Sequence, residues 1–384
     1  MSPRIAVACS GLGHVHRGIE AWAADLGQAL RRAGADVTLF AGARFEGATA
    51  LPCLRRTGRI TNSIASVTHH LGGWRYGMSN AGEVEQTSFA FALWRHVRRD
   101  FDVVHVQDPA IARWLEVAHR RGLSRPRVIY ANGTGEAAPT VRRFAYLQQL
   151  TPQAQQEWES EKPAGQLVFM IPNFIDTTRF VPGDAAAARA ALGLPPNALI
   201  VLCCAAIRRY HKRIDYLLTE FAAAAAGAGR EMILVVAGGH ETDSDELIAM
   251  GRQLLGDRVR FLTNLPRDVM PTVYQAADLF VLTSLFEMFG IVLIEAMATG
   301  LPLICHDTPA FRYVAGPAAI YADLRPAGAL AGALHSALAD GRLAALAQAA
   351  RPHVLEHFAE PIVISQIIAM YQAVLADREA VPTK

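Results

Sequence analysis

The sequence predicts an α/β protein made of two doubly wound, Rossmann-like domains that face each other across a cleft. Its 384 residues exceed the ~250 that one hydrophobic core normally serves. Short aliphatic runs alternate with amphipathic helical segments, and this alternation stops and restarts around residues 171–184. Such alternation is typical of parallel sheets wound by right-handed crossovers.

In the first half, each expected strand is a short, mainly apolar run, as in strands that are buried on both faces. Strands are expected at Ile5–Cys9, Val37–Ala41, Asp102–Val106 and Arg127–Tyr130, with helices at Gly18–Arg32 and near Ala110–Arg121. Gly34 follows the first helix, where glycine commonly ends a helix. The glycine-rich loop Ser10–Glu20 joins the first strand to this helix.

The second half repeats the pattern. Strands are expected at Leu199–Ala206, Met232–Ala237, Val259–Leu262, Leu279–Thr283 and Pro302–Cys305, with helices at Arg213–Ala225, around Asp245–Leu255, Val269–Ala276 and Ile291–Thr299. A last amphipathic helix is expected at Pro361–Asp377. The predicted domains are residues 1–178 and 179–360, with residues 361–384 as a helix that packs back on the first domain.

Composition excludes several classes of protein. Hydrophobic residues make up 52% and charged residues 19%, which excludes disorder. Mean hydropathy is +0.18, but the longest apolar run, residues 198–207, is much shorter than the ~20 residues of a spanning helix. The five cysteines form no CxxC pair and the first residues do not resemble a leader, so a cytoplasmic protein with free thiols is expected.

The charge is unevenly distributed. Net charge is only +2, which gives no polyanion-binding signature and predicts no nucleic-acid partner. Residues 1–180 carry +6 and the remainder −4. An anionic acceptor or contact with the inner face of an anionic membrane would explain the basic half. Arginine as the ordinary solvated cation of this chain explains it as well, because only three of the 37 basic residues are lysine.

The segment Ser284–Pro302 is the strongest chemical signal. Glu287 and Gly290 lie in a turn after a strand, and Glu295 lies in the second turn of the helix that begins near Ile291. Free backbone amides at Met288–Gly290 and the helix N-terminus suit a phosphate or a sugar. A carboxylate near a phosphate makes sense if it binds hydroxyls, although solvated surface glutamates are the simpler interpretation of two isolated residues.

A second segment, AAIRRYHKRIDYLL, also lies between a strand and a helix. Arg208 and Lys212 there project at the carboxyl edge of the second sheet. Cations at a helix N-terminus oppose the helix dipole, so an anion is needed to explain them. A diphosphate fits, because arginine offers a fork of donors and lysine a point charge. A basic helix cap is the alternative.

The glycine loop after the first strand resembles a dinucleotide-binding loop only in part. Gly13 and Gly18 bring the backbone close to a ligand, but His16 stands where the last glycine is expected. The second strand also lacks the acidic residue that binds an NAD ribose. His14 and His16 alone make poor evidence for a metal.

Two further strands end in polar residues. His105 and Asp108 follow one of them, and Asn132 begins the turn after the next. His105 is either a catalytic side chain or a hydrogen-bonded core histidine, and the apolar residues around it favour the core. Asn132 is equally well a substrate contact or a turn residue.

Taken in order, these segments resemble the retaining family-4 glycosyltransferases of GT-B fold. The family pattern is a glycine loop, an N-G/x-hydrophobic-D-x-x-x-F segment, an Arg…Lys pair, a glutamate pair and A-x-G-x-P. The matching positions are Gly11–Glu20, Asn173–Phe180, Arg208 with Lys212, Glu287 with Glu295, and Ala298–Pro302. The resemblance spans nearly the whole chain. Met288, Arg213 and Phe174 depart from small residues that are common in the family.

The resemblance implies a role for each position. Arg208 and Lys212 would hold the diphosphate of a nucleotide sugar, Glu295 the ribose, and Glu287 with the backbone at Met288–Ile291 the transferred sugar. The catalytic set would be Glu287, with His105 or Asn132 in place of the histidine that the family often has. The donor domain would be the second and the acceptor domain the first. The implied reaction moves a hexose-type sugar, most commonly from a UDP-sugar, with retention and without a metal or other cofactor.

The acceptor stays open among a glycan, a lipid-linked molecule and a small molecule. Two rival classes also remain. One is an NAD-dependent oxidoreductase that uses Gly11–Gly18, and the other is a two-lobed ligand-binding protein without catalysis.

Overall fold

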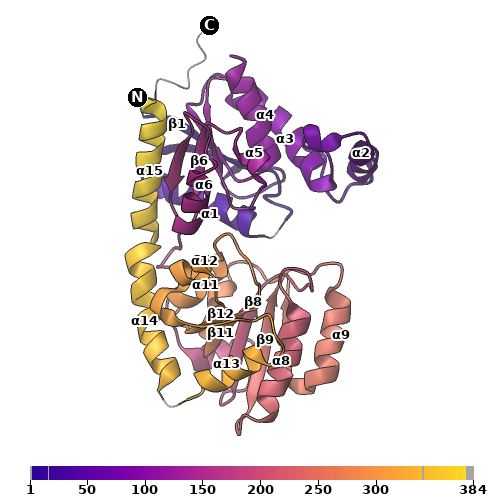
Figure 1. The fold of residues 1–384 in the computed structure, drawn as a ribbon, viewed down its shortest axis with the longest axis vertical. Coiled ribbons are helices and arrows are strands. Elements are labelled where there is room, and N and C mark those ends of the chain that lie inside the picture. The colour runs from indigo at the N-terminus through magenta and orange to yellow at the C-terminus, as the bar shows by residue number, and fades with distance from the viewer. Residues whose placement is uncertain (1, 16, 340, 378–384) are drawn as a thin grey trace. The chain divides into compact units, whose positions relative to one another are not determined.

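The computed structural model describes residues 2–15, 17–339 and 341–377, apart from the side chain of Trp74. The chain forms two compact units. The first contains residues up to Pro172 together with the chain from Ile364 onward, and the second runs from Asn173 to Val363 (Figure 1). The structure therefore divides the chain at 172/173 and 363/364, a few residues away from the predicted 178/179 and 360/361.

The first unit is a seven-stranded parallel sheet in the order β3-β2-β1-β4-β5-β6-β7. Its strands are β1 (Arg4–Cys9), β2 (Asp36–Ala41), β3 (Ala48–Ala50), β4 (Val103–Val106), β5 (Arg127–Ala131), β6 (Tyr146–Gln149) and β7 (Leu167–Met170). β1 pairs with β2 on one side and with β4 on the other. The direction of winding changes there, so the carboxyl ends of β1 and β4 border the crevice where such sheets bind ligands.

The helices of the first unit differ in how much of their surface they bury. They are α1 (Gly18–Arg32), α2 (Arg59–His70), η1 (Gly73–Arg75), α3 (Ala81–Val97), α4 (Pro109–Arg120), α5 (Ala138–Val141) and α6 (Pro152–Glu159). α1 and α4 bury a continuous stripe against the sheet, whereas α2 buries only Thr61 and Ala65. The sheet core is mainly aliphatic, because both faces of the central strands are covered.

The last helix, α15 (Glu360–Ala376), packs on the first sheet through most of its length. Its buried residues recur every three or four positions, as expected for a helix with one packed face. They are Val363, Ile364, Ile367, Met370, Tyr371 and Val374. Beyond the helix, Asp377 accepts a hydrogen bond from the Tyr146 hydroxyl at 3.0 Å.

The second unit is a six-stranded parallel sheet in the order β10-β9-β8-β11-β12-β13. Its strands are β8 (Leu199–Cys204), β9 (Met232–Gly238), β10 (Val259–Thr263), β11 (Leu279–Leu282), β12 (Leu303–His306) and β13 (Ala319–Ala322). β8 lies between β9 and β11, so the direction of winding changes there as it does at β1. The two sheets thus share one strand order.

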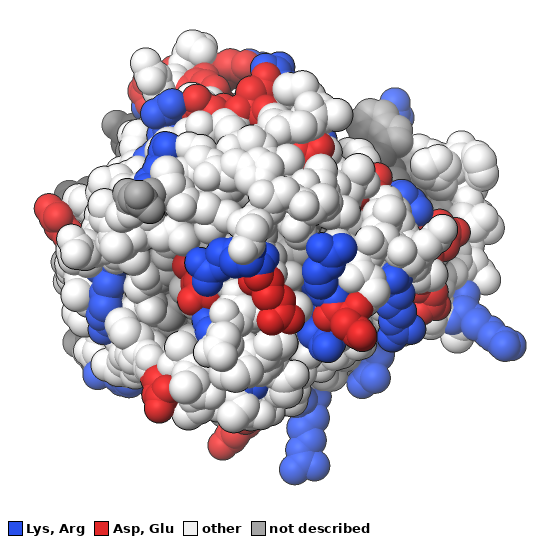
Figure 2. Space-filling model, turned by 90° about the horizontal axis from the view of Figure 1, so that it is seen from below, with Lys and Arg blue, Asp and Glu red and all other residues white. Residues whose placement is uncertain are grey.

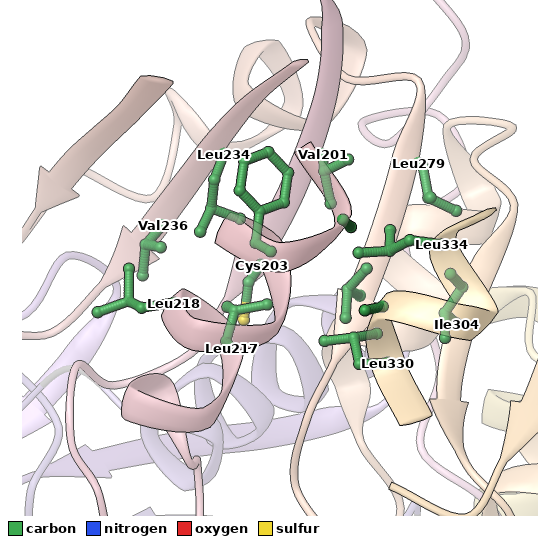
Figure 3. Packing of buried hydrophobic residues seen from close by; sticks show 14 of the residues in the cluster. Val201, Cys203, Leu217, Leu218, Leu234, Val236, Leu279, Ile304, Leu330 and Leu334 are labelled. Atoms are coloured by element: carbon green, nitrogen blue, oxygen red, sulfur yellow. The ribbon is translucent and has the colours of Figure 1, made fainter. Parts of the chain in front are cut away.

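Helices cover both faces of this second sheet. They are α7 (Ala185–Ala191), α8 (Ile214–Ala226), α9 (Ser244–Leu255), η2 (Gly256–Arg258), α10 (Met270–Gln275), α11 (Ile291–Ala298), α12 (Pro309–Ala315), η3 (Gly316–Ala318), α13 (Ala329–Ala337) and α14 (Arg342–His357). Figure 3 shows one side of the core, where Leu217 and Leu218 from α8 meet Leu234 and Val236 from β9. This packing holds the ends of β8 and β11, and the loops after them, in place.

Charged side chains are mixed on the face that Figure 2 shows. Lysine and arginine alternate with aspartate and glutamate, and broad areas between them carry neither. No helix of the described residues is long and apolar enough to cross a membrane. All five cysteines are free thiols, as their spacing predicts.

Candidate functional site

The loop after β8 carries the predicted basic pair. Arg208 and Lys212 both lie in the segment between Cys204 and the first residue of α8, and both are partly buried. His211 and Arg213, on either side of Lys212, have φ angles of 71° and 53°. This left-handed conformation costs a residue with a side chain roughly 1–2 kcal/mol. Unfavourable backbone on both sides of one lysine marks a tightly constrained turn, as is common at functional sites.

The loop after β11 supplies the acidic partner. The Lys212 ammonium donates a hydrogen bond to Oε1 of Glu287 and forms an ion pair with it. The Thr283 hydroxyl donates to the carbonyl oxygen of Lys212 at 2.7 Å. The second sheet therefore brings Lys212 and Glu287, 75 positions apart in the chain, into direct contact at its carboxyl edge.

His211 joins the same two loops and was missed by the sequence reasoning. Its Nε2 donates to the carbonyl oxygen of Phe286 at 2.7 Å and lies 3.6 Å from Oε1 of Glu287. Nδ1 lies 3.3 Å from Nη2 of Arg208. A guanidinium can only donate, so Nδ1 accepts and the ring is the neutral Nε2–H tautomer. The sequence signal for His211 was only its position beside Lys212. Its hydrogen bond to the Phe286 carbonyl oxygen depends on the fold and cannot be predicted from the sequence.

Glu295 is fixed by a different neighbour. It is 9% exposed on α11, and the Tyr274 hydroxyl of α10 donates to its Oε2 at 2.6 Å. Burial, together with the nearby Cys204 and Glu295, raises the pKa of Tyr274 well above its usual value, so this hydroxyl remains a donor. The contact that holds Glu295 is thus to α10, and the sequence reasoning had not noticed Tyr274.

In the turn before α11, the groups that can bind a ligand are backbone amides more than side chains. Gly290 has a φ of 83° and precedes the first helical residue, Ile291. The first amides of a helix have no partner within the helix, so those of this turn suit an anion or a hydroxyl. Phe289 is buried against the Phe358 ring, with centroids 5.5 Å apart, whereas Met288 is partly exposed. Phe289 can therefore offer a ligand only its backbone.

His105 lies inside the first unit and not at its edge. Nε2 of Gln148 donates to the carbonyl oxygen of Ile171 at 2.8 Å, so Oε1 of Gln148 accepts from Nε2 of His105 at 2.8 Å. Nδ1 of His105 then accepts from the Tyr371 hydroxyl of α15 at 2.8 Å. Burial lowers the pKa of His105 to about 3, so the ring is neutral. A fully buried ring with both nitrogens bonded cannot touch substrate, so His105 is the hydrogen-bonded core histidine and the prediction that it is catalytic is wrong.

Asn132 and the glycine loop remain at the edge of the first sheet. Asn132 is buried, its amide donates to Oε1 of Gln149 at 3.1 Å, and its Oδ1 has no partner among the described residues. Gly13 has a φ of 93°, and a Cβ there would lie 2.9 Å from the carbonyl group of Ala43. Gly18 begins α1 with open space around it. His16 lies outside the described residues.

A cluster of acidic side chains lies beside that loop. Asp108 is fully buried and accepts from the backbone amide of Ser10 at 2.8 Å. Burial, reinforced by the nearby Glu20, raises the pKa of Asp108 to about 6. Oε2 of Glu20 is buried without a hydrogen-bond partner among the described residues, whereas the Ser10 side chain interacts with Asp108 and favours its ionised form. The first edge therefore holds a buried carboxylate oxygen that lacks a hydrogen-bond donor.

Glu85 belongs to the same edge. Arg56 donates to it from Nη2 at 2.6 Å and from its backbone amide at 2.7 Å, and His14 Nε2 lies 3.0 Å away. Burial by itself raises the pKa of Glu85, but these bonds outweigh burial and lower it. The described residues contain no group of three or more His, Cys, Asp or Glu that could hold a metal ion.

The chain thus has two Rossmann-like domains, each with loops at the carboxyl edge of its sheet, where such sheets bind ligands, and this is the architecture of the GT-B glycosyltransferases. Two family models match the chain: "Glycosyltransferase Family 4" over residues 16–179 and "Glycosyl transferases group 1" over residues 184–352. Together they cover most of its length. The chain belongs to the family-4 glycosyltransferases of GT-B fold.

Curated relatives match over part of their length. The D-inositol 3-phosphate glycosyltransferase of Nocardia farcinica is 38% identical over 144 residues, which are 36% of this chain and 32% of that protein. The protein of the same name from Mycolicibacterium vanbaalenii is 32% identical over 54% of this chain and 48% of its own length. The chain thus matches between about a third and about a half of the length of these relatives.

Solved structures match over nearly the whole chain. A sucrose-phosphate synthase from Thermosynechococcus elongatus has a TM-score of 0.78 at 20% identity, covering 97% of this chain and 99% of that one. The Anabaena protein HepE, solved in complex with UDP-glucose, has a TM-score of 0.70 at 15% identity, covering 97% and 100%. At this identity the likeness shows the fold alone.

Proposed function

We propose that the protein is a retaining glycosyltransferase that moves a hexose-type sugar from a nucleotide-diphosphate sugar to an acceptor hydroxyl. The observation that carries this proposal is the contact between Lys212 and Glu287, with Arg208 joined to the same two loops through His211. Cations, a carboxylate and free helix amides together suit a ligand with both phosphates and hydroxyls.

The donor's diphosphate competes with Glu287 for Lys212. Without donor, the lysine is paired with the carboxylate. When a diphosphate arrives, its higher charge draws Lys212 and Arg208, and Glu287 is released to accept hydrogen bonds from the sugar hydroxyls. Glu295, already oriented by Tyr274, accepts from the ribose. Donor binding thereby assembles the sugar-binding carboxylate.

The reaction proceeds on one face of the sugar. The bond from the anomeric carbon to the diphosphate oxygen breaks, the acceptor oxygen bonds to that carbon from the same side, and the leaving phosphate takes the acceptor proton. Arg208, Lys212 and the N-terminus of α11 stabilise the negative charge that develops on the leaving group. These groups supply that stabilisation without a metal ion, so we propose that no cofactor is needed.

UDP is the first nucleotide to test, because the neighbour HepE was solved with UDP-glucose. The acceptor is proposed to bind the first unit, and a phosphorylated polyol is the first candidate because the curated relatives are named for D-inositol 3-phosphate. We also propose that the protein lies in the cytoplasm and contacts the inner face of a membrane.

The test has two steps. A thermal-shift screen with UDP, GDP, ADP, dTDP and NAD identifies the nucleotide, since a ligand that binds only the folded state raises the melting temperature. Incubation with the corresponding labelled nucleotide sugars and inositol phosphate then follows nucleoside diphosphate release. Stabilisation by one nucleoside diphosphate and its acceptor-dependent release support the proposal. Stabilisation by NAD alone, or capture of the sugar without release, contradicts it.

A further inference from the structure

The outer side of α2 is apolar, which is unusual for a helix at the edge of a protein. Ile60, Val67 and Leu71 are 67%, 59% and 76% exposed, and Ile64 is partly buried. Their spacing of four, three and four positions places all of them on one side of the helix, with Leu71 just past its last residue. Single exposed aliphatic residues are common on proteins, but an aligned row of three, with a fourth partly buried between them, is not.

This row is not the side by which α2 packs on the protein. Thr61 and Ala65 are the buried residues of the helix, and the Thr68 hydroxyl donates to the carbonyl oxygens of Ile64 and Met78. Figure 1 shows α2 beside α3, on the other side of the first unit from α15. The helix is therefore held by small and polar residues, while its aliphatic row points elsewhere.

The segment of the chain that contains the row carries charge of one sign. From Gly47 to Gly82 the chain contains no aspartate or glutamate, but it contains Arg55 and Arg59, both exposed. Arg59 is the first residue of α2, where a cation opposes the helix dipole and an external anion would favour it. We call the row Ile60, Ile64, Val67 and Leu71, together with Arg55 and Arg59, the α2 surface.

We propose that the α2 surface docks on an anionic lipid bilayer, with the aliphatic row in the headgroup region and the arginines on lipid phosphates. A helix with an apolar row and basic neighbours binds such an interface in the plane of the membrane, with a strength set by buried apolar area and charge. Four aliphatic side chains bury far less apolar surface than a spanning helix, so the association is reversible.

A second copy of the chain is a poorer occupant of the same surface. In a two-fold dimer the same patch meets itself, so both copies would bring Arg55 and Arg59 into one interface, and the α2 surface offers no carboxylate to pair with them. An anionic bilayer, in contrast, complements both the charge and the aliphatic row. This inference does not depend on which sugar or nucleotide the enzyme uses.

The test is flotation of the full-length protein with phosphatidylcholine vesicles, prepared with and without phosphatidylglycerol. Wild type is expected to float only with the anionic vesicles and to be released by salt, since surface charge is screened within ~10 Å at 0.1 M. The triple variant Ile60→Ser, Val67→Ser, Leu71→Ser should lose roughly tenfold or more in partitioning, because each side chain gives up apolar burial. Arg55→Gln with Arg59→Gln should remove the preference for anionic lipid.

Matched controls lie in the second unit. Leu254→Ser with Leu355→Ser removes exposed leucines, and Arg252→Gln with Arg258→Gln removes exposed arginines. Both should float like wild type, and circular dichroism checks that all variants fold. Failure of wild type to float overturns the proposal, as does equal flotation of wild type and the triple variant. A concentration-dependent dimer that the triple variant abolishes would assign the surface to a second copy instead. If nucleotide binding fails while flotation succeeds, only the proposed function falls.

Discussion

The two sheets have the same strand order but different charged side chains at their carboxyl edges. After β8 and β11 the second sheet presents Arg208 and Lys212, together with the carboxylates of Glu287 and Glu295. After β1 and β4 the first sheet presents buried Asp108 and Glu20, with Arg56 already paired to Glu85. One edge suits phosphate oxygens and the other suits hydroxyl protons.

The total charge of each half points the other way. Residues 1–180 carry +6 and the rest −4, although the basic edge lies in the second unit. Charge at a site is decided by the few side chains that strand ends bring together, and the remaining charges are spread over a solvated surface. The basic excess of the first half is therefore weak evidence about its ligand, whereas the placement of Arg55 and Arg59 beside an aliphatic row is specific.

Lys212→Ala should produce the largest effect at the basic edge. It removes a cation from the diphosphate and leaves Glu287 unpaired, so turnover should fall by a hundredfold or more, about 3 kcal/mol of transition-state stabilisation. Steady-state release of nucleoside diphosphate measures it. Arg209→Ala is the matched control, because that arginine lies in the same loop but pairs with Asp215 and Glu246. Equal activity of wild type and Lys212→Ala would contradict the assignment.

At the acidic edge, Asp108→Asn should change how stability depends on pH. The pKa of Asp108 in the folded protein is about 6, against an ordinary 3.8, so the folded state keeps a proton that the unfolded state has lost. This proton stabilises the folded state fully below pH ~4. As pH rises through 6 the stabilisation disappears, so the free energy of unfolding falls by an amount on the order of 2–3 kcal/mol.

The asparagine variant lacks this loss, so it should be more stable than wild type at pH 7–8 by up to about 2 kcal/mol, with the advantage vanishing near pH 4. Urea titrations at several pH values give the difference. His105 acts with the opposite sign, because the pKa of His105 is lowered to about 3 and stability is lost as pH falls below 6.5. Both proteins contain His105, so its contribution cancels when their stabilities are compared. If the free energies of unfolding of the two proteins differ by the same amount at every pH, the prediction is contradicted.

Tyr274→Phe tests whether Glu295 needs its donor. The hydroxyl is removed while the ring stays, so the carboxylate is kept but no longer oriented by α10. Binding of the nucleoside diphosphate found in the screen should weaken by about 1 kcal/mol, the usual net value of one hydrogen bond. Isothermal titration measures it, with Tyr321→Phe as control, because that hydroxyl bonds to the carbonyl oxygen of Gly316. Unchanged affinity would show that Glu295 does not need the Tyr274 hydroxyl in order to bind the nucleotide.

The smallest effects are expected at His211, where two variants separate its two contacts. Asparagine places an acceptor near Nδ1 and can keep the bond from Arg208, whereas glutamine places a donor near Nε2 and can keep the bond to the Phe286 carbonyl. Each variant should lower kcat/KM by a factor that corresponds to about 0.5–1 kcal/mol of transition-state stabilisation, and His211→Ala should lower it by more.

His211→Gly controls for the positive φ, since glycine adopts it without strain. If glycine is as active as histidine, the ring does not position the loops. If asparagine and glutamine both match wild type while alanine does not, either contact alone is sufficient.

The sequence was enough to predict both parallel sheets, the alternation of helices and the two loops that carry the donor-site residues. Short apolar runs that alternate with amphipathic helices along the chain are typical of such sheets. The last helix was also predicted, as residues 361–377 against the observed Glu360–Ala376. The strands β3 and β6 were not predicted, because they have only three and four residues. The helices α2, α3 and α14 were not predicted either, although they have 12, 17 and 16 residues.

Only the tertiary structure could decide which polar side chains meet. Lys212 and Glu287 are 75 positions apart, Tyr274 and Glu295 lie on different helices, and the Phe286 carbonyl is invisible in a sequence. His105 shows the same limit, since its bonds to Gln148 and Tyr371 depend on where β6 and α15 pack. Hydrophobic periodicity acts along the chain and can be read from it, whereas hydrogen bonds between distant residues depend on packing in three dimensions.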